Sequence, residues 1–177
     1  MQKRFGWYTS CLLVTGLATL LVGTVMAKTP SADVTETLAR FNKADPSLAA
    51  VIKAAAGYAL FPSVKKAGLG IGGARGSGEL VESGAAVGKA SLSQISIGFQ
   101  AGGQAYAELI LFETPKALAD FKASKFAFGA QVSAVAVKSG ASGNAKYADG
   151  VKVLTLANGG LMYEASVGGQ KFKFEAY

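Results

Sequence analysis

Residues 57–78 read GYALFPSVKKAGLGIGGARGSG, and this stretch decides how the chain is interpreted. Residues 58–61 are predicted to form a short strand that Pro62 ends, and glycines at close spacing follow. The segment from Gly68 to Gly73 matches G-x-G-x-x-G, but the residues after it are too rich in glycine to open a helix, as a dinucleotide-binding turn requires. We expect instead glycines in a strand, where missing side chains let another backbone or a bulky residue approach closely.

Two helices are predicted in front of this stretch. Residues 31–41 carry apolar side chains at helical spacing, with polar residues between them. Asp45 and Pro46 are typical of an N-cap followed by a proline in the first turn, and Gly57 is expected to end this second helix. The apolar residues of the two segments are Val34, Leu38, Phe41, Leu48, Val51, Ile52 and Ala55.

Strands dominate the rest of the sequence. Residues 91–112 mostly alternate apolar and polar positions and are predicted to form two strands around Gly102 and Gly103. Thr114 and Pro115 repeat the cap-and-proline pattern and predict one helix among the strands. Four further strand-like runs follow, separated by glycine-containing turns: residues 128–137, 151–156, 160–167 and 170–174. We therefore predict an α+β fold, in which N-terminal helices precede a β-rich antiparallel meander or barrel-like body with one inserted helix.

The first 27 residues have the three parts of an export signal. Lys3 and Arg4 precede an apolar stretch over residues 11–26, and small residues end at Ala27. The apolar stretch is shorter than the roughly 18 to 20 residues that cross a bilayer, so we expect cleavage rather than anchoring. We predict an exported protein, periplasmic or secreted, with a single mature domain: a helical region (28–56) and a β-rich body (57–177).

The composition excludes several classes of chemistry. The chain has no histidine, and its single cysteine, Cys11, lies within the predicted signal. Disulfides, thiolate chemistry, imidazole chemistry and the usual zinc sites are therefore not expected in the mature part, and neither a cofactor nor a metal is predicted. A hydrolase that uses Ser63 and Lys66 needs no histidine, but the order of the nearby Lys-Ser-Gly and Ser-Gly-Asn elements differs from that in serine penicillin-binding enzymes. The carboxylates of Glu79, Glu82, Glu108 and Glu113 are expected on a solvated surface.

Basic residues form the main candidate site. The net charge of +7, which falls to +5 once Lys3 and Arg4 are removed, favours an anionic surface as the partner. Nucleic acid is not expected, because no run of clustered Arg and Lys appears. Lys65, Lys66 and Arg75 flank the glycine-rich stretch, whose backbone N–H groups in a turn would complete a receptor for a phosphate headgroup. The helices add three more cations around their apolar face: Arg40, Lys43 and Lys53.

Several motifs, in the same order along the chain, resemble the SYLF domain family. Residues 57–62 (GYALFP) and 66–73 (KAGLGIGG) are similar to the opening signature of that family. Residues 96–104 (SIGFQAGGQ) resemble its central strand, residues 111–121 its following strand and helix, and residues 158–162 (NGGLM) its C-terminal strand. The resemblance covers essentially the whole mature chain from about residue 45 onward.

The resemblance implies a lipid-binding module without enzymatic activity. Eukaryotic members bind phosphoinositide membranes through a basic, amphipathic N-terminal region, and exported bacterial members are described as lipid-binding proteins. Because this chain begins with a signal instead of a membrane helix, we expect anionic phospholipid or lipopolysaccharide as the target. The alternative is a structural or protein-interaction module of the periplasm or cell surface, without lipid dependence. The candidate lipid-binding residues are Lys65, Lys66 and Arg75 by the signature, and Arg40, Lys43 and Lys53 on the helices.

Overall fold

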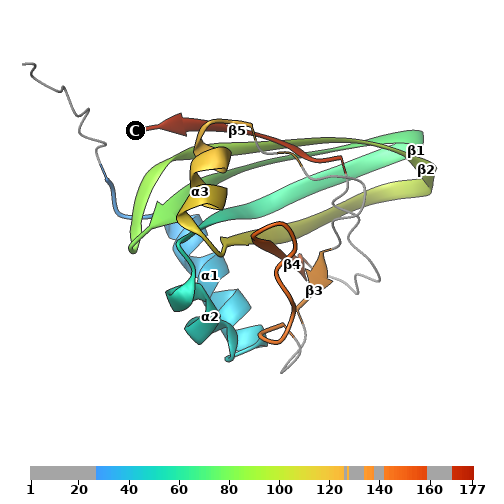
Figure 1. Cartoon of the computed structure of the whole chain (residues 1–177). Helices are drawn as coiled ribbons and strands as arrows, with labels where there is room; N and C mark the ends of the chain where they lie inside the picture. Colours follow the sequence, from blue (N-terminus) through green and yellow to red (C-terminus); the bar gives the residue numbers. More distant parts are fainter. Residues whose placement is uncertain (1–26, 126, 128–133, 138–141, 159–168) are drawn as a thin grey trace, which may run out of the picture.

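The structure is a computed structural model of the chain, and it describes residues 27–125, 127, 134–137, 142–158 and 169–177. For residues 69–71 and 96–102 it describes the backbone only. The elements are α1 (Ala32–Ala44), α2 (Leu48–Ala54), β1 (Gly57–Glu82), β2 (Ala85–Phe112), α3 (Pro115–Lys122), β3 (Val135–Ala136), β4 (Val151–Ala157) and β5 (Lys171–Ala176). The predicted α+β fold, with helices before a β-rich body and one inserted helix, is confirmed (Figure 1). The predicted signal, apart from Ala27, and the strand predicted over 160–167 lie outside the described residues.

β1 and β2 form one long antiparallel hairpin that provides most of the sheet. They pair along almost their whole length, and the turn between them has positive φ angles of 48° at Ser83 and 82° at Gly84. The two strands predicted around Gly102 and Gly103 are therefore one continuous strand, β2. Both glycines pair with β1 in the ladder, because a glycine in a strand needs no turn when a neighbouring strand takes up its backbone hydrogen bonds.

The strand predicted over residues 58–61 likewise does not end at Pro62. Pro62 falls where the register shifts between Phe61 and Val64, and β1 continues beyond it to Glu82. A bulge leaves residues of one strand outside the regular pairing, so no ladder hydrogen bond requires the backbone N–H that proline lacks.

The hairpin folds back over itself, so that the second half of β1 lies against its first half. A Cβ atom on Gly78 would collide with the backbone of Leu60, and one on Gly76 would lie 2.9 Å from Val64 Cγ2. These two glycines allow a close approach that a side chain would block, as the sequence predicted for this stretch. The bend lies at the end of the hairpin remote from the helices (Figure 1).

Two of the remaining strands, β4 and β5, pair with the two halves of β2. β5 pairs antiparallel with residues 88–93, and β4 pairs antiparallel with residues 106–112. β3 pairs parallel with β4, so the order is β1-β2-β4-β3, with β5 also on β2. The sheet is thus antiparallel except for the short β3–β4 pair, and it is not a simple meander because β5 returns to β2. β4 and β5 confirm the strands predicted over 151–156 and 170–174.

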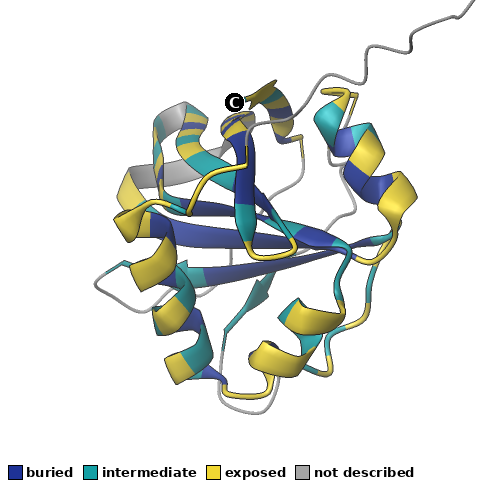
Figure 2. Cartoon of the chain, turned by 90° about the vertical axis from the view of Figure 1, so that its left-hand side faces the viewer, coloured by how far each residue is buried: buried dark blue, intermediate teal, exposed yellow. Residues whose placement is uncertain are grey.

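α1 and α2 cover one face of the sheet. Val34 and Phe41 of α1 and Leu48 of α2 are buried in one apolar cluster with Leu109 and Leu111 of β2. Figure 2 shows the strands between the helices buried along much of their length, while the helices expose one side. The apolar face of the helices, around which the sequence places Arg40, Lys43 and Lys53, is therefore used inside the fold, because it covers the sheet.

The second apolar cluster lies on the other face, between the sheet and α3. Four of its phenylalanine rings pack in a row, with centroids 5.0 Å apart for Phe112 and Phe121, 5.5 Å for Phe121 and Phe172, and 5.9 Å for Phe61 and Phe172. Because Phe61 belongs to the first half of β1 and Phe172 to β5, this cluster holds the two halves of the folded hairpin together.

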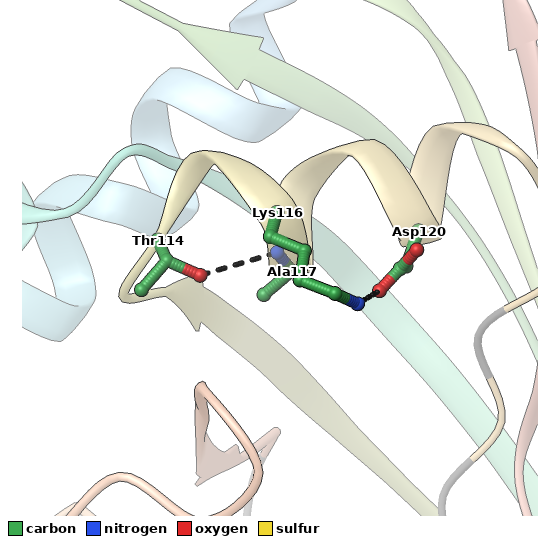
Figure 3. Close-up of polar contacts among 4 residues, drawn as sticks. All are labelled: Thr114, Lys116, Ala117 and Asp120. Atoms are coloured by element: carbon green, nitrogen blue, oxygen red, sulfur yellow. Dashed lines mark hydrogen bonds and ion pairs between the residues drawn. The ribbon is translucent and has the colours of Figure 1, made fainter.

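The N-terminus of α3 follows its sequence signal. Thr114 Oγ1 accepts a hydrogen bond from the Ala117 backbone N–H at 3.2 Å, and Pro115 occupies the first turn (Figure 3). On the exposed side of the helix, Lys116 Nζ donates to Asp120 Oδ2 at 2.6 Å.

The ends of α2 differ from the prediction. Its N-cap is Ser47, and Asp45 instead accepts hydrogen bonds from the Ser47 N–H and hydroxyl and from the Ser142 N–H. Gly57 does not end the helix but starts β1, because Ala55 is already extended and Gly57 packs against the Val81 carbonyl.

Candidate functional site

Two rows of polar side chains cross three neighbouring strands on one face of the sheet. In one row Arg75 of β1, Ser93 of β2 and Lys171 of β5 are register partners; in the next, Ser77, Ser91 and Lys173 are. All six residues are exposed. Since neighbouring strands lie about 4.8 Å apart, the residues of each row are close neighbours. The face therefore presents three cations and three hydroxyl groups within a small area.

A groove of about 1030 Å³ contains these rows. Its walls come from two further segments: Ser63 and Lys65 from the first half of β1, and Ser124 and Lys125 from the residues that follow α3. An adjoining hollow of about 750 Å³ shares Lys65 with the groove. We call this site the basic groove and define it by its cations and serines: Lys65, Arg75, Lys125, Lys171, Lys173, Ser63, Ser77, Ser91, Ser93 and Ser124.

The electrostatics of the basic groove are strongly positive. Five cations line it against one carboxylate, Asp33. None of the five forms an ion pair with a described residue, whereas Lys122 elsewhere on the surface pairs with Glu82 at 2.5 Å. Unpaired cations in a concave site raise the local concentration of anions. Lysine, arginine and serine together supply the donors that a phosphate or carboxylate oxygen accepts from.

The positive region ends along the strands at a third row. There Glu79 of β1, Lys89 of β2 and Glu175 of β5 are register partners, and they line a smaller hollow of about 440 Å³. Glu79 is also held by other groups, because its carboxylate accepts hydrogen bonds from the Ser31 N–H and the Tyr177 hydroxyl. An anion is therefore favoured in the basic groove and disfavoured beyond it.

The six cations predicted from the sequence fall into separate places. Lys65 and Arg75 line the basic groove, whereas Lys66, the next residue along the strand, does not. Arg40 and Lys43 line another hollow of about 410 Å³, and Arg40 donates to Asn158 Oδ1 at 2.8 Å. Lys53 is exposed on α2.

Sequence reasoning missed three of the groove's cations, Lys125, Lys171 and Lys173. A signal for two of them was present, because Lys171-Phe172-Lys173-Phe174 alternates and its phenylalanines face the core. An alternating strand with one apolar face has its lysines on the other face. What the sequence did not contain is the register that places this strand beside Ser91 and Ser93.

The glycine-rich stretch does not provide the predicted turn of N–H groups. Residues 68–78 belong to β1 and pair with β2, so their N–H groups do not converge on a ligand. The hydrolase alternative gains no support either. Ser63 is exposed next to the bulge and forms no hydrogen bond with Lys66 among the described contacts. In the part of the chain that the structure describes, no cluster of three or more potential metal ligands occurs.

Glu108 is the carboxylate that departs most from prediction. It was expected on the surface, yet it is fully buried, and its Oε2 accepts a hydrogen bond from Gln170 Nε2 at 3.0 Å. Burial raises the pKa of this carboxyl to about 8, although the hydrogen bond from Gln170 favours the ionised form. The Tyr106 hydroxyl is buried beside it, and burial raises the pKa of that group too. These groups lie in the core and do not line the basic groove.

The fold and the site together are those of an α+β domain with a cation-lined groove on its sheet. Residues 93–176 match the model of the Ysc84 family, described as Las17-binding protein actin regulator. Over this part of the chain, from β2 to β5, the predicted resemblance to the SYLF domain family is confirmed, while the signature predicted over residues 57–73 lies outside the matched residues. The family is a binding module and not a known enzyme family. No curated protein matches the chain.

Proposed function

We propose that the chain is an exported, non-enzymatic protein that binds anionic lipid surfaces through the basic groove. The observation that carries the proposal is the set of five cations without an ion-pair partner among the described residues. The similarity of residues 93–176 to a family of lipid-binding or actin-regulating modules supports a binding role. The target would be anionic phospholipid or lipopolysaccharide, and the location the periplasm or the cell exterior.

The expected attachment is reversible and sensitive to salt. A Lys or Arg near an anionic membrane contributes about 1 kcal/mol, so five give about 5 kcal/mol before the cost of ordering is included. Among the residues that the structure describes, no helix has the length and the apolar character needed to cross a bilayer. The serines of the groove would add hydrogen bonds to phosphate oxygens, which makes the site better suited to headgroups than a flat basic surface.

Sedimentation with vesicles tests the proposal. The chain is expressed with its own N-terminal segment, and the mass of the recovered protein shows whether residues 1–27 have been removed. It is then mixed with phosphatidylcholine vesicles, with or without phosphatidylglycerol or lipopolysaccharide, at low and high salt. We expect sedimentation with the anionic vesicles only, and its loss at high salt. Recovery in the supernatant under every condition would refute the proposal.

A matched pair of variants locates the binding surface. Arg75→Glu with Lys171→Glu should weaken vesicle binding about 30-fold or more, since two attractive charges become repulsive. Lys43→Glu with Lys53→Glu changes the net charge by the same amount on the helices and should leave most of the affinity. Equal losses in both double variants would mean that only the overall charge matters and that the basic groove is not the site.

A second function is favoured by the description of the family, which names a protein partner and not a lipid. A basic groove on a rigid sheet also fits an acidic segment of another protein. This module would have no lipid dependence. The vesicle experiment separates the two functions, because a protein-interaction module would remain in the supernatant. Such a module would instead co-purify with a protein partner, and the Arg75→Glu, Lys171→Glu double variant would not retain that partner.

A further inference from the structure

Ile95 is an unusual surface residue. Its side chain is 79% exposed, and it is the only exposed large apolar side chain among those that the structure describes. Single exposed apolar residues are common, but this one lines the hollow that adjoins the basic groove, together with Lys65, Arg75 and Lys171. An apolar side chain therefore projects directly beside a concentration of cations.

The neighbours of Ile95 leave it uncovered. Its register partner on β1 is Gly73. On its other side lies Gly169, where an added Cβ would be 3.8 Å from the Ile95 carbonyl oxygen. In most sheets the side chains of the two neighbouring strands cover a large apolar residue. Here both neighbours lack side chains, so the exposure of Ile95 follows from the sequence and is not a local accident of its rotamer.

The character of the sheet face changes in order along β2. Moving from the bend toward the hairpin turn, the face presents Ile95, then the row of Ser93, then the row of Ser91, and finally the row of Lys89 with its two glutamates. The order is apolar, basic, basic, acidic, from the bent end of the hairpin to its other end.

We propose that the bent end of the β1–β2 hairpin is the end that enters an anionic phospholipid bilayer, with Ile95 in the interfacial region and Arg75 and Lys171 at the level of the headgroup phosphates. This inference rests on the proposed function and gives it an orientation. The two glutamates of the acidic row, Glu79 and Glu175, then lie farthest from the negative surface.

The spacing of the rows fits the layers of a bilayer surface. Consecutive rows are two residues apart along the strand, which is about 7 Å. Apolar groups of interfacial proteins enter about 5–10 Å into the boundary between headgroups and acyl chains. When Ile95 reaches that boundary, the row of Arg75, Ser93 and Lys171 stands at the phosphates. The bend lies away from α1, α2 and α3, so the helices do not obstruct this approach (Figure 1).

Tryptophan fluorescence tests the orientation, because the single tryptophan of the sequence, Trp7, lies within the predicted export signal. In a chain with Trp7→Phe, the substitution Ile95→Trp leaves one tryptophan, at the bent end. The control carries Trp7→Phe and Ala49→Trp, on the exposed side of α2. With phosphatidylglycerol-containing vesicles we expect the emission of the Ile95→Trp variant to shift to the blue and to be quenched by brominated phospholipids, whereas the emission of the Ala49→Trp variant should show neither change.

Affinity gives a second readout. Ile95→Ser removes the apolar group from an exposed position, so circular dichroism and thermal unfolding should stay unchanged. Vesicle binding should weaken about tenfold, as expected for the loss of one partly buried isoleucine side chain. If the chain sediments with anionic vesicles but the emission of the Ile95→Trp variant stays unshifted, or that of the Ala49→Trp variant shifts in its place, the orientation is overturned and the proposed function stands. If no variant sediments, both are overturned.

Discussion

The buried carboxyl of Glu108 predicts an unusual dependence of stability on pH, which Glu108→Gln should abolish. In the folded chain the pKa of this group is about 8, against an ordinary value of 4.5. Between these two pH values the folded chain keeps a proton that the unfolded chain releases. Raising the pH therefore favours unfolding. The stability that the protonated carboxyl contributes is complete below pH 4.5 and is lost progressively as the pH rises to about 8.

The magnitude follows from the two pKa values. Each pKa unit corresponds to about 1.36 kcal/mol, so the full loss between pH 4.5 and pH 8 is about 5 kcal/mol, of which about 3 kcal/mol is lost by pH 7. A glutamine at position 108 has nearly the same shape, does not titrate, and keeps an oxygen that can accept the hydrogen bond from Gln170. The variant should therefore equal the parent near pH 4.5 and exceed it by about 3 kcal/mol at pH 7.

Urea unfolding followed by circular dichroism, at several pH values from 4.5 to 8, measures this difference. Glu175→Gln is the control, because it makes the same substitution at an exposed carboxylate. The buried Asp45 does not interfere, because its hydrogen bonds with Ser47 and Ser142 lower its pKa and place its titration at more acidic pH. If the gap between Glu108→Gln and the parent were the same at pH 4.5 and pH 7, the carboxyl would be ionised in the folded chain and the reasoning would fail.

Three further substitutions test the fold. Gly78→Ala should destabilise the chain by about 3 kcal/mol or more, because the added Cβ would collide with the backbone of Leu60. Gly103→Ala is the control and should be tolerated, because its Cβ would lie 3.9 Å from the nearest heavy atom. Similar urea midpoints for the two variants would contradict the folded-back hairpin. Asp45→Asn should destabilise the chain at pH 7. Hydrogen bonds to the Asp45 carboxylate depress its pKa, so their contribution to the free energy of unfolding is present above about pH 4 and is lost below it. The difference in stability between the variant and the parent should therefore disappear in acid. A difference that persists at low pH would contradict the assigned role of the carboxylate.

The helices were largely predictable because their signals are local. The residues that end a helix and the spacing of its apolar side chains lie within a few positions of one another, and Thr114 with Pro115 marked the start of α3 correctly. The lengths of the strands were not predictable in this way, because they depend on pairing with segments that are distant in the sequence. Pro62 and Gly102 look like strand ends in isolation, yet each lies within a strand because another segment, far away in the sequence, pairs beside it.

Glu108 shows a signal that was present but was not used. It precedes the unbroken apolar run Leu109-Ile110-Leu111-Phe112, and such a run is typical of a strand buried on both faces. Leu109 and Leu111 pack under α1 and α2, while Ile110 and Phe112 belong to the other cluster. By strand alternation Glu108 shares the face of Ile110 and Phe112. Because both faces of this strand are buried, the carboxylate could not reach solvent.

The basic groove could be predicted only in part, because its residues come from five segments that are separated in the sequence. Lys65 and Arg75 were found because they flank the glycines. The serines and the remaining lysines reach the same place through the pairing of β2 with β1 and with β5, and a register of this kind is set by packing across the sheet.

The glycine-rich stretch that first suggested a phosphate site contributes to one, but by packing and not by its N–H groups. An added Cβ on Gly76 would lie 3.4 Å from the Ser63 carbonyl oxygen and 2.9 Å from Val64 Cγ2, so only a glycine lets the second half of β1 lie this close to the first. That approach is what brings Ser63 and Lys65 beside Arg75 in the basic groove. The glycines are thus required for the site even though they form no converging turn of N–H groups. A larger residue at position 76 should therefore impair vesicle binding together with folding, whereas Arg75→Glu with Lys171→Glu should impair binding alone.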